Sequence, residues 1–436
     1  MSGDSVFRFG PFTLDRRRRR LCKGETPIRL KPKEWELLCC LVDQRDRVLS
    51  KDELLDQLWP RQTVTEANLS QTVYAVRKAL GESARQARWI ETVPRLGYRF
   101  VASAPAGGRG TPSPESSTGA VPASARAAYE RGRYCWRRFT TSSLKQALAF
   151  FDEALEAAPR FAEAHAWRSA TWSALGNIGA LSPRESAEHA RRAADQAITI
   201  DDSLATGYEM RGVVELYFDW NFEAARRSFD KAIERDAGSA NAHHLRANAL
   251  AFCEEFEAAH ADIEQAQALD PTSLITRTDA GLFHYLERDF EAAQTCLEAV
   301  LRQDPTFAHA RVKLAHVLAT RNQPADALRQ CELAAEDLRD GVTGTHACML
   351  GLAGRPDEAR AMLSELIDDV SLRSADPYGM ALAYLGLGEE DNALDALALA
   401  LEYRSRNLVT LRSDPTWDAL RSRGSFKELL ASVAYR

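Results

Sequence analysis

Residues 50–102 read SKDELLDQLWPRQTVTEANLSQTVYAVRKALGESARQARWIETVPRLGYRFVA. Within this stretch Leu69, Val73, Val76 and Leu80 recur at spacings of four, three and four residues, which place them on one face of a helix. The opposite face carries polar and basic side chains that can meet base edges or phosphate: Asn68, Ser70, Gln71, Tyr74, Arg77 and Lys78. Two short strands joined by a basic loop follow this helix. The stretch therefore predicts a winged helix-turn-helix that binds double-stranded DNA.

The charge of the chain is distributed unevenly. The net charge of the 436 residues is −6. Residues 1–102, however, hold 20 Lys and Arg against 13 Asp and Glu, a net of +7, and the remainder carries −13. A basic module joined to an acidic one favours DNA binding at one end and a different role at the other. The length also predicts more than one domain.

The sequence contains no signal for secretion or membrane insertion. No stretch approaches about 18 uninterrupted apolar residues, and the first apolar residues are too scattered for a signal peptide. The eight cysteines form no CxxC pair and no metal-ligand spacing, so we expect reduced thiols in helical cores. These features predict a cytoplasmic protein, associated with the nucleoid and without contact to a membrane.

The N-terminal domain, residues 1–102, can be divided into elements. Residues 5–30 alternate apolar and polar side chains around turns and predict a short antiparallel sheet. Residues 31–43 predict a helix with proline in its first turn. Ser50 and Glu53 have the spacing of a capping box, which predicts the start of a second helix.

A linker and a repetitive region follow. Residues 103–123 are rich in Pro, Gly, Ser and Ala and predict a flexible linker. After it, Phe-Glu-Ala-Ala recurs every 34 residues at Phe222, Phe256 and Phe290. A 34-residue period of paired helices is typical of tetratricopeptide repeats. Residues 124–436 therefore predict about eight helix pairs, and the tail DPTWDALRSRGSFKELLASV predicts a terminal capping helix. The predicted fold class is multidomain: an α+β winged helix-turn-helix followed by an all-α tetratricopeptide-repeat solenoid.

Residues 5–102 resemble the OmpR/PhoB-type winged-helix domain of bacterial transcriptional regulators. The resemblance is carried by PKEWELLCCL, SKDELLDQLWP, VRKALGE and GYRF. The chain looks like the ToxR-like and CadC-like one-component regulators, but without their membrane span, and its helical region is similar to that of HilA-type activators. Because the winged helix begins at residue 5, without a receiver domain before it, we do not expect control by a phospho-receiver.

The resemblance implies a set of DNA contacts. The exposed face of the third helix would enter the major groove, where Asn68 and Gln71 can pair with adenine and Arg77 can bind guanine or phosphate. In the wing, Arg95 would reach the minor groove, whereas Pro94 replaces a residue that is often arginine. The resemblance also implies that Tyr98 and Trp59 contact phosphate. It further implies that loop 59–65 contacts RNA polymerase.

Some of these residues allow other interpretations. Arg77 and Lys78 also suit the negative end of any surface helix. The run Arg16–Arg20 favours a solvated hairpin over a DNA contact. Groups such as His243 and His244 with His260, or His309 with His316, show no distinctive metal-ligand spacing. Asn248 and Lys313 lie where a repeat groove would bind a peptide end, but only fragments of such a clamp are present.

The sequence favours a bacterial sequence-specific transcriptional regulator. Its repeat domain would bind a partner protein, a peptide or a small ligand, or a second copy to form a homodimer. The alternative is a tetratricopeptide scaffold with weak DNA binding. An enzyme hidden in the repeats ranks lowest, because no nucleophile motif, cofactor motif or paired-carboxylate site is present. No catalytic residue, cofactor or metal is expected. The operator, the signal and the sign of regulation remain open.

Overall fold

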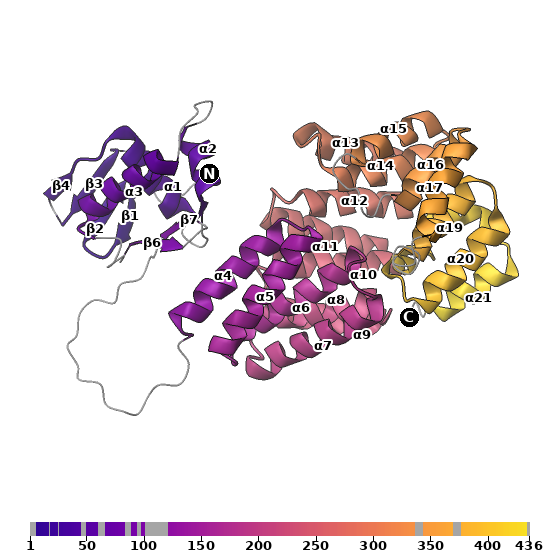
Figure 1. Ribbon diagram of the computed structural model, residues 1–436, viewed down its shortest axis with the longest axis horizontal. Helices are drawn as coiled ribbons and strands as arrows, with labels where there is room; N and C mark the ends of the chain where they lie inside the picture. Colours follow the sequence, from indigo (N-terminus) through magenta and orange to yellow (C-terminus); the bar gives the residue numbers. More distant parts are fainter. Residues whose placement is uncertain are drawn as a thin grey trace. The chain divides into compact units, whose positions relative to one another are not determined.

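The computed structural model describes residues 6–16, 18–24, 26–44, 49–59, 66–82, 89–93, 97–100, 121–335, 343–368 and 376–433. The chain divides into two compact units, Met1–Ala120 and Val121–Arg436, and each is described by itself (Figure 1). No helix within the described ranges is long and apolar enough to cross a membrane. The expected linker falls largely on residues 101–120, which lie outside these ranges.

Four short strands form the first sheet of the N-terminal unit. They are β1 (Val6–Phe9), β2 (Phe12–Asp15), β3 (Arg20–Lys23) and β4 (Thr26–Ile28), and each pairs antiparallel with the next. This confirms the sheet predicted over residues 5–30. Phe9 and Phe12 are buried, and both rings meet the ring of Trp89 edge-on, with centroids 5.2 and 6.1 Å away. The sheet therefore shares one core with the rest of the unit.

Three helices follow the first sheet: α1 (Pro32–Asp43), α2 (Lys51–Leu58) and α3 (Glu66–Leu80). The predicted capping box is present at the start of α2. The Ser50 hydroxyl accepts from the Glu53 amide at 3.1 Å, and the Glu53 carboxylate accepts from the Ser50 amide at 2.8 Å. Such a cap stabilises a helix by about 1 kcal/mol. Gly81, at φ +74°, directly follows the last residue of α3, where glycine commonly ends a helix.

A three-stranded antiparallel sheet completes the unit, in the order β5 (Leu49–Ser50), β7 (Gly97–Phe100), β6 (Ile90–Val93). The hairpin of β6 and β7 is the predicted wing. Gly97 faces Ser50 across the β5–β7 pair, and a Cβ on it would lie 1.9 Å from the carbonyl oxygen of Leu49. Only glycine therefore permits the close approach that attaches the wing to the strand before α2.

Eight consecutive helix pairs make up most of the described part of the second unit (Figure 1). They are α4 (Ala123–Arg137) with α5 (Thr141–Ala157), α6 (Ala162–Asn177) with α7 (Pro183–Ile200), α8 (Ala205–Tyr217) with α9 (Phe222–Arg235), α10 (Ala240–Phe252) with α11 (Phe256–Leu269), α12 (Leu274–Leu286) with α13 (Phe290–Gln303), α14 (Ala308–Thr320) with α15 (Pro324–Ala335), α16 (Thr343–Leu352) with α17 (Pro356–Asp368), and α19 (Pro377–Gly386) with α20 (Glu390–Glu402). The first helices of successive pairs contact one another from α4 to α16. Their common surface is called the inner face below.

Small residues allow the two helices of a pair to approach closely. Gly212 in α8 lies against the buried ring of Phe229 in α9, and Gly281 in α12 lies against Leu297 in α13. A Cβ on either glycine would come within 3 Å of those side chains. The alternation of small and large residues at the 34-residue period thus sets the distance between paired helices.

The C-terminal segment differs from the single capping helix that the tail predicted. Two 3-10 helices, η1 (Arg406–Thr410) and η2 (Pro415–Leu420), come before the last helix, α21 (Gly424–Ser432). Asp414 accepts a hydrogen bond from the Thr416 amide and begins η2, where Pro415 is in the first turn. Of the predicted tail, only Gly424–Ser432 forms an α-helix, and it packs on α20.

Candidate DNA interface

The two faces of α3 have the character that the sequence predicted. Leu69, Val73, Val76 and Leu80 are at most 4% exposed and belong to the core of the N-terminal unit. The opposite face is open to solvent, and Tyr74 is 69% exposed. Exposed side chains on this face are Asn68, Ser70, Gln71, Tyr74 and Lys78. An exposed row of amide, hydroxyl and ammonium groups on one helix can enter a major groove.

Arg77 does not belong to this exposed face, and its predicted position was wrong. Its side chain is buried, and the residue is 5% exposed. Its Nε and Nη2 donate to the carbonyl oxygen of Ile90 at 3.1 and 2.6 Å, and Nη2 also donates to the Thr92 hydroxyl at 2.7 Å. Arg77 therefore attaches the C-terminal end of α3 to strand β6 of the wing. Arg77 lies one helical turn after Val73, and its burial depends on the carbonyl oxygen of Ile90 in β6.

The surroundings of Arg77 are those of a buried cation with partners. Its Nε lies 3.9 Å from a carboxylate oxygen of Glu82, and its guanidinium carbon lies 5.8 Å from the centroid of the Tyr98 ring. Burial lowers the pKa of Arg77, and the charge of Glu82 opposes that shift. Glu82 in turn accepts from the backbone amides of Trp89 and Ile90 at 2.6 and 3.0 Å. Together these contacts fix the wing against the helix.

The other residues predicted to contact DNA or RNA polymerase differ in exposure, and some of them lie outside the described residues. Tyr98, in the central strand β7, is 7% exposed, so its ring belongs to the core. Trp59 is half-buried at the end of α2, where its amide donates to the Leu55 carbonyl oxygen at 2.9 Å. The Lys33 ammonium lies 5.8 Å from the Trp59 ring centroid. Arg95, Pro94 and all of loop 59–65 except Trp59 lie outside the described residues.

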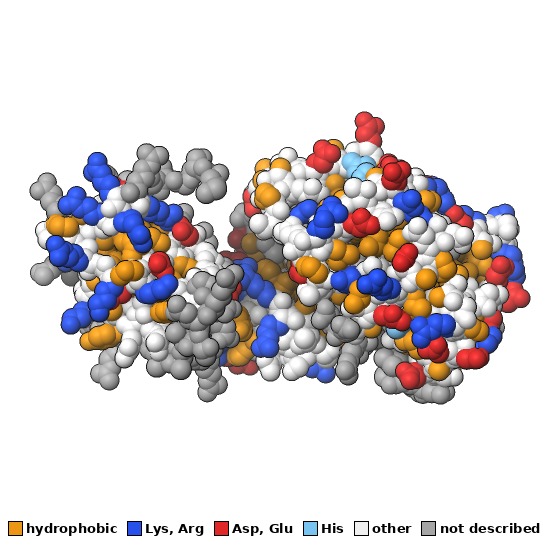
Figure 2. Space-filling view, turned by 90° about the horizontal axis from the view of Figure 1, so that it is seen from above, with side chains coloured by type: hydrophobic (Ala, Val, Ile, Leu, Met, Phe, Trp, Pro, Cys, Tyr) orange, Lys and Arg blue, Asp and Glu red, His pale blue; other side chains and the backbone are white. Residues whose placement is uncertain are grey.

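Several basic side chains lie on the face of the N-terminal unit that Figure 2 shows. Within the run Arg16–Arg20, Arg16 forms an ion pair with Asp43 at the end of α1, and Arg18 lies 3.9 Å from a carboxylate oxygen of Asp15. These two arginines are therefore engaged within the domain. Lys78, in contrast, is exposed on the same helix as Gln71 and Tyr74.

The inner face of the repeat unit holds a buried polar cluster that the sequence suggested only in part. Asn248, which is 3% exposed, places its Nδ2 3.3 Å from His244 Nε2 and 3.4 Å from Asp279. His244 Nε2 lies 2.7 Å from the Asp279 carboxylate. Burial raises the pKa of Asp279, but His244 and, less strongly, the charge of Lys313 outweigh burial, so the net shift is downward. Asn248 and Lys313 lie in the first helices of their pairs, as expected.

The histidines do not form the groups that the sequence allowed. His243 and His244, in α10, approach Asp262 and Asp279, whereas His260 approaches Glu287. His260, His284 and Glu287 form, within the described ranges, a group whose ligand atoms lie within 4.8 Å of one another. The contact between His260 and Glu287, at 2.8 Å, however, belongs to a repeated ion pair. This pair joins a second helix to the turn after the next first helix: Arg191–Asp219, Arg226–Glu255, His260–Glu287 and Arg360–Glu389. Packing between successive helix pairs therefore accounts for the contact between His260 and Glu287.

Comparison with known proteins identifies the family of the N-terminal unit. Residues 24–100 match the family described as "Transcriptional regulatory protein, C terminal". The transcriptional regulator HilA of Salmonella typhi is 36% identical over 106 residues, which cover 23% of this chain and 18% of HilA. The phosphate regulon regulatory protein PhoB of Escherichia coli is 31% identical over 101 residues, 23% of this chain and 44% of PhoB. The N-terminal unit is an OmpR/PhoB-type winged-helix domain.

This winged-helix domain makes up only part of its relatives as well. The chain spans about a fifth of the length of HilA and under half of PhoB. For the second unit, a chain in the crystal structure of the APC/C hetero-tetramer Cut9-Hcn1 is a structural neighbour at 16% identity and TM-score 0.48, covering 71% of this chain and 55% of that one. The second unit is a tetratricopeptide-like solenoid, as its helix pairs and its 34-residue period require.

Proposed function

We propose that this chain is a bacterial one-component transcriptional regulator that binds specific DNA through α3 and the β6–β7 wing. The observation that carries the proposal is the exposed face of α3, with Gln71, Tyr74 and Lys78 open to solvent on a basic winged-helix domain. Asn68 and Gln71 supply amide groups for base edges, and Lys78 supplies a cation for phosphate. Arg95 is proposed as the minor-groove contact of the wing.

The same proposal assigns roles to the other parts of the chain. Loop 59–65 follows α2 and is proposed to contact RNA polymerase, as the family resemblance implies. The repeat unit is proposed to bind a partner protein or a ligand, or to hold two copies together on repeated half-sites. Because the winged helix and the solenoid are separate compact units, each role can be tested by itself.

Selection of bound fragments from sheared genomic DNA at physiological salt tests the DNA-binding role. The full chain is compared with a full-chain variant in which Gln71 and Lys78 are both alanine. We expect the wild type to enrich a shared motif and the variant to lose that enrichment. If neither protein enriches a motif, and charge-driven binding collapses with salt, the scaffold interpretation replaces the regulator.

A further inference from the structure

The segment Arg404–Arg421, called the strap below, lies across the inner face of its own solenoid. It follows α20, the last helix of the eighth pair, yet it returns to the third through sixth pairs. Its first 3-10 helix, η1, contacts α8, and its second, η2, contacts α14. The contacts join residues 100 to 185 positions apart in sequence. The last helix pair is already covered by α21, which packs on α20. Covering the last pair therefore does not explain why the strap extends to α8 and α14.

Arginines hold the first end of the strap on aromatic rings. The Arg404 guanidinium carbon lies 5.0 Å from the ring centroid of Trp220, just beyond α8. That of Arg406 lies 4.4 Å from the ring centroid of Tyr217, within α8. Burial lowers the pKa of Arg406, while Tyr217 and Asp279 oppose that shift. Stacking of guanidinium on aromatic faces is a recognition contact for arginine side chains.

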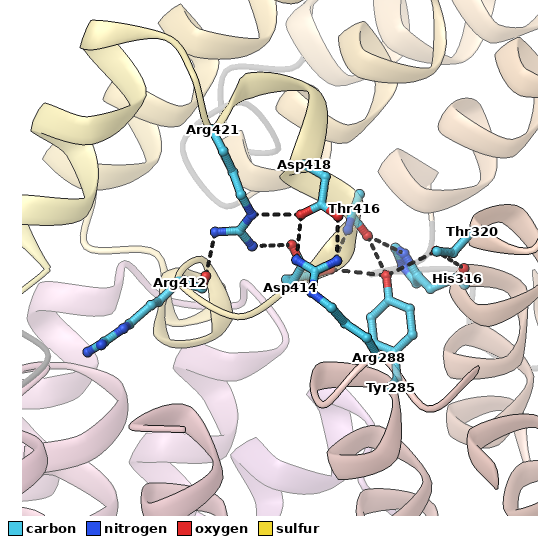
Figure 3. A network of polar contacts seen from close by, with 9 residues as sticks. All are labelled: Tyr285, Arg288, His316, Thr320, Arg412, Asp414, Thr416, Asp418 and Arg421. Carbon is cyan, nitrogen blue, oxygen red and sulfur yellow. Dashed lines mark hydrogen bonds and ion pairs between the residues drawn. The ribbon is translucent and has the colours of Figure 1, made fainter. Parts of the chain in front are cut away.

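Acidic groups hold the other end (Figure 3). The Asp414 carboxylate, on a residue 8% exposed, accepts from the hydroxyl of Tyr285 at 3.1 Å and from that of Tyr378 at 3.4 Å. The Asp418 carboxylate accepts two hydrogen bonds from the Arg288 guanidinium, at 2.5 and 2.8 Å. Tyr285 lies in the last turn of α12, and Arg288 lies in the turn that follows this helix.

Apolar anchors lie between these polar ends. Leu408, Val409 and Leu411 are at most 3% exposed, and Trp417 is fully buried, with its indole nitrogen donating to the Tyr378 hydroxyl at 3.0 Å. In contrast, the side chains of Arg288 and Asp418 are 47% and 44% exposed. Buried apolar anchors with a half-exposed rim of ion pairs are the composition of a protein–peptide interface.

We propose that the inner face from α8 to α14, together with Tyr378 of α19, is a peptide-binding surface, and that the strap is its resident ligand. A partner protein would then bind by presenting a peptide of the same chemistry: two arginines separated by one residue, an apolar run, and an Asp-Pro-Thr-Trp-Asp turn. This inference deepens the partner-binding role proposed above and rests on it. The strap is tethered, so its effective concentration is in the millimolar range and a free peptide competes poorly with it.

Hydrogen exchange of the wild-type full chain gives the first test. We expect the amides of residues 404–421 to exchange through a local opening, while those of α12 and α14 stay protected. If the strap exchanges only when α12 and α14 also unfold, it is a fixed part of the fold and the proposal is overturned.

A labelled peptide with the sequence of residues 404–421 gives the second test. Asp418→Arg reverses one charge of the Arg288 pair and should loosen the strap, so we expect this variant to bind the peptide at least about tenfold more tightly than the wild type. Adding Arg288→Asp to this variant restores an ion pair between residue 288 and residue 418 of the strap. It also reverses the charge that the surface offers to Asp418 of the peptide, so binding of the labelled peptide should be lost again. If Asp418→Arg retains wild-type circular dichroism and no peptide binds, the surface takes no peptide.

The loosened state can also be reached without a charge reversal. If Asp418→Arg does not fold, the double variant Arg404→Ala with Arg406→Ala loosens the opposite end of the strap. Tighter binding of the labelled peptide by this variant would support the proposal, and no binding by the folded variant would overturn it. The assay contains no DNA, so its failure is separate from failure of the DNA-selection experiment.

Discussion

The Arg77 guanidinium donates two hydrogen bonds to the carbonyl oxygen of Ile90, at 3.1 Å from Nε and 2.6 Å from Nη2. This contact joins the C-terminal end of α3 to the first strand of the wing. An exposed α3 face and an adjacent wing can bind one DNA duplex together only if their relative orientation is fixed. We therefore expect Arg77 to contribute to DNA binding through the shape of the domain.

Arg77→Ala is expected to destabilise the winged-helix domain by about 2–4 kcal/mol. It leaves the Ile90 carbonyl oxygen without its buried donor and the Glu82 carboxylate without its cation. Denaturant unfolding of the full chain, with hydrogen exchange of α3 as the local probe, measures this loss. Unchanged protection of α3, combined with loss of affinity only for sites that contain guanine, would show that Arg77 reaches DNA instead.

Gln71→Ala is expected to leave stability within about 0.5 kcal/mol of the wild type, because the side chain is exposed. Its effect should appear in specific DNA binding, as a loss of about 1–3 kcal/mol at one base position. Lys78→Ala is the matched control on the same face, and it should weaken binding to all sequences and reduce the salt dependence. Footprinting of one selected operator compares the two. Equal losses on specific and non-specific DNA for Gln71→Ala would contradict its role in reading bases.

Gly212→Ala is expected to destabilise the repeat unit by about 1–3 kcal/mol. The added methyl would lie 2.4 Å from Cε1 of the Phe229 ring, which is fully buried and cannot move away freely. Gly424→Ala is the control, because no other group lies within 4 Å of the point that its added methyl would occupy. Thermal unfolding of both variants tests the difference, and Phe229→Leu should restore part of the loss in Gly212→Ala. Equal melting temperatures for the two alanine variants would disprove the packing explanation.

Local sequence patterns predicted the elements but not every side-chain position. The spacing of Leu69, Val73 and Val76 identified α3 and its buried stripe, because helical periodicity is a local property. Arg77 follows this stripe directly, and its basic character favoured the surface. Its burial depends on the Ile90 carbonyl oxygen in a strand 13 residues later, a tertiary partner that no local spacing records.

The strap shows the same limit on a larger scale. The 34-residue period predicted the helix pairs, because each pair contacts mainly its neighbours. Asp414 and Tyr285, in contrast, are 129 residues apart and meet only because the strap returns across the inner face. The tail therefore predicted a terminal helix, whereas its first part lies on the inner face.

The burial of His316 predicts that the folded chain loses stability in acid. It lies in α14, where its Nδ1 is 3.3 Å from the Thr416 hydroxyl of the strap. Burial lowers the pKa of His316 to about 4; the Asp414 charge opposes that shift and the Lys313 charge adds to it. The ordinary value is 6.5, so between about pH 6.5 and 4 the unfolded chain binds the proton and the folded chain does not. The stabilising contribution is complete above pH 6.5 and is lost as the pH falls.

His316→Gln keeps a hydrogen-bonding side chain that does not titrate. Between pH 7 and pH 4.5 this variant should lose on the order of 2 kcal/mol less unfolding free energy than the wild type, since one pKa unit corresponds to about 1.36 kcal/mol. Denaturant titrations of the two full chains at both pH values measure that difference. Because His316 faces the strap, the protection of residues 404–421 against hydrogen exchange, relative to the intrinsic rate at each pH, should also fall at pH 4.5, and more in the wild type than in the variant. The same acid sensitivity in both proteins would mean that other buried groups control the transition.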